Sequence, residues 1–195
     1  MDKIDSEQPL QSCSNNNKSA VTNGDGINGT NAKCMENKRI HNEDLLDQVK
    51  QDFDSLKDIQ NFNRIGSRVV PICATQDQLV CEMLVSAEHV NSKGTLHGGQ
   101  TATLTDIVTA RAIGMSVRDK GMASIEISCS YFLPVKLDDT VIITANVLKV
   151  GRNVAFAECE FRRKSDGKLA AKGKHTVAIL PNAPPVTASG QIIQY

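Results

Sequence analysis

The sequence predicts an α+β fold in which a mostly antiparallel β-sheet wraps around one central helix. Two patterns carry this prediction. The run from Gly98 to about Val117 is small and apolar with few polar interruptions, which is typical of a largely buried helix. After Gly121 the chain turns to period two and shows no second helical pattern, so a parallel βαβ sheet is not expected.

Residues 1–41 are expected to form a disordered polar tail. The first 40 residues contain no aromatic residue and few aliphatic ones, so they cannot bury enough apolar surface to offset chain entropy. The start, MDKIDSEQPL, is acidic and lacks an apolar run, which argues against a secretory signal and against an Arg-rich presequence.

An N-terminal amphipathic helix is expected from Asn42 onward, with Asn42 as its N-cap and Glu43 and Asp44 in its first turn. Its polar face is acid-rich rather than basic, so packing on its own domain is favoured over docking on a membrane or a partner. Apolar residues recur at spacings of three and four. They are Leu45, Leu46, Val49, Phe53, Leu56, Ile59 and Phe62.

Strands are expected at about 64–73 and 78–86, followed by a polar loop and the central helix. The alternation after Gly121 predicts a further strand that places Ser124 and Glu126 on the face opposite to Ile125 and Ile127.

Three more strands are expected at about 139–149, 153–163 and 168–180, joined by hairpin turns at VGRN and SDGK. The globular domain is therefore expected to span 42–180. The Pro-rich residues 181–195 are expected to form an extended or disordered tail.

The composition gives no support for several classes of partner and ligand. Lys plus Arg and Asp plus Glu number 22 each, so the charge balance gives no reason to expect nucleic acid or an anionic membrane surface. The six cysteines are irregularly spaced and form no CxxC pair, which argues against a zinc site and a disulfide framework. No uncharged apolar run approaches the roughly 20 residues of a membrane span. A cytoplasmic chain with reduced thiols and no bound metal is the expectation.

Asp106 stands out inside the predicted central helix. A carboxylate in an apolar setting is costly unless it is hydrogen-bonded, protonated or functional, but the pattern also allows an exposed strip with Gln100, Thr103 and Thr109. Gly98 and Gly99 at the helix start leave unhindered N–H groups that can polarise a carbonyl or simply join loop to helix.

Two longer motifs surround these residues. The first is H-x-N-x-x-G-T-L-H-G-G-x-x-A-x-x-x-D over residues 89–106, and the second is S-x-E-x-x-x-x-Y-x-x-P-x-K over residues 124–136. They resemble the hotdog-fold acyl-CoA thioesterases of the thioesterase superfamily member 2 type, with phenylacetate-pathway thioesterases as more distant relatives. The resemblance covers about residues 45–180 and implies a hotdog fold.

The resemblance implies a role for four residues. An aspartate matching Asp106 acts as general base or nucleophile, and a serine matching Ser124 positions the attacking water. An asparagine matching Asn91 holds the water or substrate, and a glycine matching Gly98 offers a backbone N–H to the thioester oxygen. It also implies that each site is assembled between two subunits of a homodimer, and that dimers pair into homotetramers.

Coenzyme A contacts are implied for a second group of residues. The turn from Lys149 through Gly151 and Arg152 matches the family's cofactor-contacting loop, although an ordinary solvated hairpin has the same pattern. Tyr131 matches an aromatic residue near the substrate, and Glu126 belongs to the second motif. His97 either orients the substrate or caps the helix.

The expected function is hydrolysis of medium- to long-chain fatty acyl-CoA or aryl-acyl-CoA. This chemistry needs an activated water and an oxyanion donor but no metal or redox cofactor, because thiolate is a competent leaving group. General-base attack by water is preferred over direct carboxylate attack through an anhydride. A non-catalytic acyl-CoA binding module and a hotdog hydratase are the alternatives. Similar proteins associate with mitochondria, so that organelle is an alternative location.

Overall fold

The computed structural model describes residues 42–187 and 191–192, all of which lie in the compact unit Ile40–Tyr195. The predicted polar tail 1–41 lies outside the described residues, as do residues 188–190 and 193–195.

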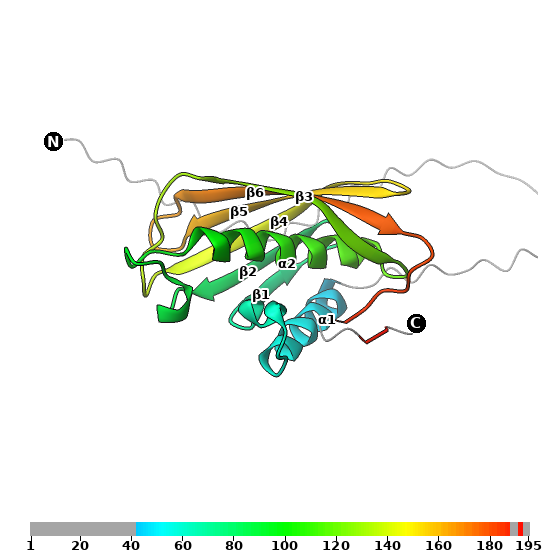
Figure 1. Cartoon of the computed structure of the whole chain (residues 1–195), viewed down its shortest axis with the longest axis horizontal. Helices are drawn as coiled ribbons and strands as arrows, with labels where there is room; N and C mark the ends of the chain where they lie inside the picture. The colour runs from blue at the N-terminus through cyan, green and yellow to red at the C-terminus, as the bar shows by residue number, and fades with distance from the viewer. Residues whose placement is uncertain (1–41, 188–190, 193–195) are drawn as a thin grey trace, which may run out of the picture. The chain divides into compact units, whose positions relative to one another are not determined.

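The described chain folds into one antiparallel sheet with a helix along one face (Figure 1). The strands are β1 (Val70–Ala74), β2 (Gln78–Leu84), β3 (Gly121–Tyr131), β4 (Thr140–Val150), β5 (Val154–Arg163) and β6 (Leu169–Leu180). Their order in the sheet is β1-β2-β4-β5-β6-β3. The helix that packs on the sheet is α2 (Gly98–Ser116). The predicted α+β class with a central helix is confirmed, and the architecture is that of the hotdog fold.

The core lies between α2 and the inner face of the sheet. Leu104 and Val108 of α2 and Ile143 of β4 are fully buried there. Alternate residues of β4, β5 and β6 point into this layer, as the period-two patterns predict. Burying each such large aliphatic side chain contributes about 1.5–3 kcal/mol.

The N-terminal helix α1 (Asn42–Asp54) is shorter than the pattern predicts. Leu45, Val49 and Phe53 are buried as expected, and α1 packs against β1. The α-helix ends at Asp54, and short 3-10 helices follow at Ser55–Lys57 (η1) and Phe62–Gly66 (η2).

The prediction that Phe62 lies on the buried face of this helix is wrong, since its side chain is 63% exposed. The Asn61 side chain accepts a hydrogen bond from the Asn63 N–H at 3.0 Å and so starts a new turn in place of the helix. The same turn delays β1 to Val70, although the pattern predicted a strand from about residue 64.

The helix approaches β6 closely at one glycine. A Cβ built on Gly173 would lie 3.0 Å from the Cβ of Thr105 and closer still to its Oγ1 and Cγ2. Only glycine therefore permits this separation between α2 and the sheet.

The first residues of the C-terminal segment fold back onto the sheet. The Gly121 N–H donates a hydrogen bond to the Ala183 carbonyl at 2.6 Å, and Val186 forms an isolated antiparallel bridge with Ile192. The described part of this segment thus has local structure beyond a plain extended chain.

Among the described cysteines, Cys81, Cys129 and Cys159 are free thiols. Burial raises the pKa of the Cys81 and Cys159 thiols, which keeps them protonated. Cys73 is disulfide-bonded, so the expectation of reduced thiols is wrong for this half-buried residue of the edge strand β1. No helix within 42–187 is long and apolar enough to cross a membrane.

Candidate active site

The loop before α2 forms one wall of a cavity of about 580 Å³. Asn91 shapes this loop: its side-chain oxygen accepts from the Lys93 N–H at 2.9 Å, and its Nδ2 donates to Thr95 Oγ1 at 3.1 Å. Gly94 closes the turn with a φ of 70°, which favours glycine. The lining consists of Asn91, Thr95, Leu96, Gly98, Gly99 and the segment Tyr131, Phe132, Leu133 and Pro134.

The N-terminus of α2 opens into this cavity. His97 Nδ1 accepts a hydrogen bond from the Gly99 N–H at 2.9 Å, so the imidazole caps the helix. The Tyr131 hydroxyl donates to the Gly98 carbonyl at 2.9 Å, and partial burial raises the pKa of Tyr131, which keeps the donor proton in place. The first amides of a helix have no intrahelical partner, so Gly98 offers its N–H at the positive end of the helix dipole.

Asp106 lies further along α2, in a second cluster. The Ser124 hydroxyl donates to Asp106 Oδ1 at 2.9 Å. His175 Nε2 lies 3.0 Å from Ser124 Oγ and 3.4 Å from Asp106 Oδ1. The Asp106 side chain is 43% exposed, whereas that of His175 is 1% exposed. The carboxylate is therefore held from its buried side and presented toward the outside.

A β-bulge in β3 brings Ser124 to this cluster. Ser124 pairs with Val177 and Glu126 with Thr176, so the register between β3 and β6 shifts at residue 125. The prediction that Ser124 shares a face with Glu126 is therefore wrong. The extra residue turns the Ser124 hydroxyl toward α2, a role that bulges often have near functional sites.

Sequence reasoning missed His175. The residue lies in the last strand among alternating buried positions, between Gly173 and Val177, and it completes no local motif. A polar residue at a core position of a strand is the signal that could have found it, because such a residue requires partners. Thr109 supplies one, with Oγ1 at 2.6 Å from His175 Nδ1. Burial lowers the pKa of His175, and the nearby Asp106 carboxylate opposes this effect.

Within one chain the two parts of the predicted site are separate. Asp106 lies eight positions after Gly98 on the helix, which is about 12 Å along its axis. Asp106, Ser124 and His175 do not line the cavity. The structure thus groups Asn91, Gly98 and Tyr131 in one place and Asp106 with Ser124 in another.

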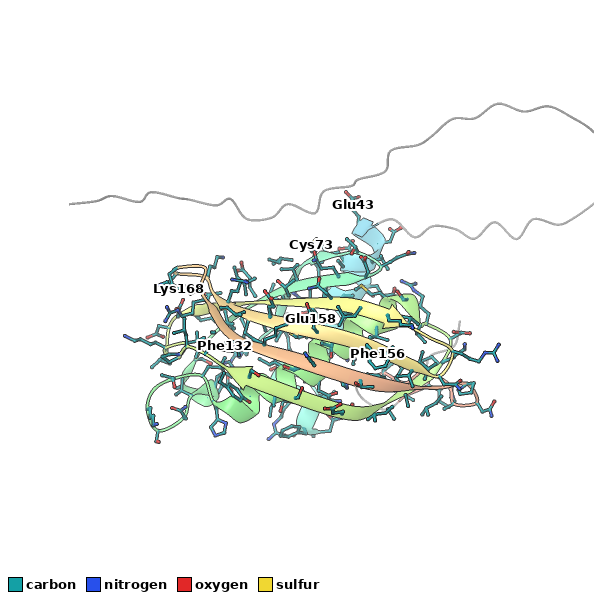
Figure 2. All side chains as sticks on the ribbon, turned by 90° about the horizontal axis from the view of Figure 1, so that it is seen from above. Glu43, Cys73, Phe132, Phe156, Glu158 and Lys168 are labelled. Carbon is teal, nitrogen blue, oxygen red and sulfur yellow. The ribbon has the colours of Figure 1, made fainter. Side chains whose placement is uncertain are left out.

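The predicted coenzyme A residues lie at a third position. Lys149, Gly151 and Arg152 belong to the β4–β5 hairpin, where the Gly151 N–H donates to the Val154 carbonyl at 2.8 Å. Lys149 pairs across the hairpin with Phe156, and Phe132 lines the cavity. These two phenylalanines lie toward opposite ends of the sheet (Figure 2), so within one chain the hairpin is far from the cavity.

Glu126 lies on the outer face of β3, away from α2, since its partner Thr176 alternates with the buried His175 and Val177. Within the described residues no group of three or more His, Cys, Asp or Glu side chains could hold a metal ion.

Comparison with known proteins finds relatives that are named thioesterases or esterases. Residues 93–170 match the thioesterase superfamily. A Caenorhabditis elegans protein provisionally named an esterase is 60% identical over 145 residues, which cover 74% of this chain and 86% of that protein. Human acyl-coenzyme A thioesterase 13 is 35% identical over 132 residues, which cover 68% of this chain and 94% of the enzyme.

A crystal structure of zebrafish thioesterase superfamily member 2 aligns with a TM-score of 0.67 and 41% identity. The alignment covers 69% of this chain and 97% of the zebrafish chain.

Proposed function

The chain belongs to the thioesterase superfamily, in the hotdog type represented by acyl-CoA thioesterase 13, and we propose that it hydrolyses acyl-CoA with Asp106 as the general base. One observation carries the assignment of the base. Asp106 is half-exposed on a largely buried helix and accepts a hydrogen bond from the Ser124 hydroxyl at 2.9 Å. A carboxylate oriented in this way can bind a water molecule and accept its proton.

The proposed reaction needs two groups of residues. Asp106 and Ser124 hold the water, whose oxygen forms a bond to the thioester carbon while its proton passes to the carboxylate. The Gly98 N–H and the Asn91 amide stabilise the oxyanion. The C–S bond then breaks, and the coenzyme A thiolate leaves.

A homodimer would bring the two groups together. The outer edge of β3 is the free edge of the sheet beside both Ser124 and Tyr131. If two β3 strands pair antiparallel about their midpoint, the Gly121 end of one lies against the Tyr131 end of the other. Asp106 of one subunit would then face the cavity that Gly98 lines in the other subunit.

The same pairing would also bring the β4–β5 hairpin close to this shared site. The Ile179 N–H donates to the Asn153 carbonyl at 2.9 Å, and Ile179 pairs with Met122 at the start of β3. Lys149 and Arg152 are exposed on this hairpin and would contact coenzyme A phosphates there. Further pairing of dimers into a tetramer stays a prediction, which the native mass tests.

The surface around Asp106 suits an apolar acyl group. Ala102, Ala110 and Gly114 form the half-buried stripe of α2 on either side of Asp106, and Ile127 is partly exposed on the neighbouring strand. We therefore propose medium- to long-chain fatty acyl-CoA or aryl-acyl-CoA as substrate.

The test follows thiol release from a series of acyl-CoAs with the wild-type chain, Asp106→Asn and Asp119→Asn. Asp119 is an exposed aspartate beyond the end of α2 and serves as the matched control. Loss of a general base lowers kcat by about 10²–10⁴-fold, whereas the control should retain wild-type activity.

Two outcomes would reject the proposal. A folded Asp106→Asn protein with most of its activity would exclude Asp106 as the base. Tight acyl-CoA binding without any turnover by the wild-type chain would instead favour the binding module.

A further inference from the structure

The cluster of Asp106, Ser124 and His175 has one hydrogen too few to fill every hydrogen bond that its geometry allows. The Ser124 hydroxyl lies 2.9 Å from Asp106 Oδ1 and 3.0 Å from His175 Nε2, but it carries a single hydrogen. It can donate to one of these two acceptors at a time. The other acceptor, either Asp106 Oδ1 or His175 Nε2, then faces a lone pair of the serine oxygen unless that acceptor carries a proton of its own.

The opposite side of the imidazole fixes its tautomer. Thr109 Oγ1 lies 2.6 Å from the Thr105 carbonyl and 2.6 Å from His175 Nδ1. The carbonyl can only accept, so the threonine hydrogen points to it. His175 Nδ1 must then carry a hydrogen and donate it to Thr109, which leaves Nε2 of the neutral ring free to accept.

Among the residues that the structure describes, one charged group lies beside His175. Its neighbours across the sheet are Ala157 of β5 and Ile127 of β3, and from α2 it meets Thr109 and Asp106. Asp106 is the only charge among them. A proton on Nε2 would face this carboxylate 3.4 Å away, while the 1% exposure of the ring opposes the charge.

The arrangement differs from a Ser-His-Asp nucleophile. In such a triad the carboxylate binds Nδ1 on the far side of the imidazole from the serine. Here Thr109 occupies Nδ1, and Asp106 lies on the same side as Ser124. The carboxylate competes with the imidazole for the serine hydrogen, so Ser124 is not activated for attack.

We propose that His175 is a positioning residue that shares, through Ser124, the proton that Asp106 removes from water. This inference rests on the proposed function. The water O–H bond breaks as the C–O bond forms, and the proton enters the network between Asp106 Oδ1 and His175 Nε2. After the C–S bond breaks, this proton leaves to the thiolate or to solvent, and no other reactant is needed.

The first experiment requires no substrate. Nitrogen NMR of the full chain reports the tautomer of each imidazole, and His175→Gln assigns the His175 signals. The wild-type chain should show the Nδ1–H tautomer near neutral pH. The titration midpoint of His175 should move to lower pH in Asp106→Asn, because the facing charge is lost.

An Nε2–H tautomer in the wild-type chain, or an unchanged midpoint in Asp106→Asn, would overturn the proposal whether or not the chain hydrolyses thioesters. Thr109→Val provides a second variant of similar shape. It removes the acceptor at Nδ1, so the tautomer should switch to Nε2–H, and retention of the Nδ1–H form would contradict the inferred network.

The second experiment compares the pH profiles of kcat/KM for the wild-type chain and His175→Gln. With one proton site fewer in the network, the acidic limb of the variant should move to lower pH while kcat on the plateau falls. A lower plateau with an unmoved limb would show that His175 only fills space, and proton sharing would be rejected.

Discussion

At the scale of single residues, the proposed chemistry depends on three polar side chains that come from three different elements and meet in one cluster. Asp106 comes from α2, Ser124 from a bulge in β3, and His175 from the middle of β6. Motif spacing predicted the first two, because they belong to contiguous stretches of sequence. His175 could not be found in this way, since its link to Asp106 exists only after β6 pairs with β3.

Two buried histidines make stability depend on pH. Burial lowers the pKa of both His89 and His175 in the folded chain, below the usual value of about 6.5 that applies when the chain is unfolded. The unfolded state therefore binds more protons as the pH falls below that value, which favours unfolding. The stability is fully present above about pH 7 and is lost as the pH decreases toward the folded pKa values.

Denaturant unfolding between pH 7.5 and 5.5 tests this sign, since that range spans the usual histidine pKa of about 6.5. The free energy of unfolding should decrease toward pH 5.5, and the decrease should be smaller in His175→Gln. A free energy of unfolding that rises toward pH 5.5 would contradict the burial of neutral imidazoles.

At the scale of elements, the periodicity of hydrophobic residues predicted α2 and the last three strands closely, and the ends of α1 and β1 poorly. The bounds of β4, β5 and β6 differ from the predicted ones by one residue at most. The bulge at residue 125 and the break of α1 at Asp54 were not predicted, because both depend on local hydrogen bonds and register. The bulge matters most, since it decides which face Ser124 occupies.

The contact of α2 with β6 provides a test at this scale. In Gly173→Ala the new methyl group would overlap Thr105 and push the helix away from the sheet. Overpacking of this kind costs about 1–3 kcal/mol. Denaturant unfolding measures the loss.

Gly114→Ala is the matched control, because a Cβ there would meet only the Met122 Cε at 3.8 Å. Replacing a helical glycine by alanine should leave stability unchanged or raise it by up to about 1 kcal/mol. Equal destabilisation by both substitutions would show that the close approach at Gly173 is not the cause.

At the scale of the whole molecule, the two edges of the sheet differ. The β1 edge is short, contains Pro71 and is packed by α1, which are features that prevent further strand pairing. The β3 edge is 11 residues long, contains no proline and exposes Ile125. A strand edge of this kind is suited to pairing with a second chain.

Ile125→Lys should weaken that pairing, because a charge would enter the interface between the two β3 strands. Light scattering should then show a smaller species than the wild-type chain at equal concentration. Val70→Lys is the control on the opposite edge, where Val70 is 58% exposed, similar to the 59% of Ile125. An unchanged mass in Ile125→Lys, or an equal loss in both variants, would exclude the β3 interface.

A site shared between two subunits would explain why the sequence predicted the site residues but not how they come together. Asp106 and Gly98 are eight residues apart on one rigid helix, so no folding of a single chain brings the proposed base to the proposed oxyanion donor. The sequence contains the residues of both groups, but which groups meet would be decided by the proposed pairing of subunits.

The shared site is tested most directly by mixing two variants that should each be inactive, Asp106→Asn and Asn91→Asp, and measuring thioesterase activity. The first lacks the base, and the second lacks the amide donor but keeps the side-chain oxygen that shapes its loop. If subunits assort at random into dimers, half of the dimers are mixed and each mixed dimer has one intact site. Thiol release from acyl-CoA should then recover to about a quarter of the wild-type rate. A mixture no more active than its two components, with subunit exchange verified, would show that each chain works alone and would contradict the shared site.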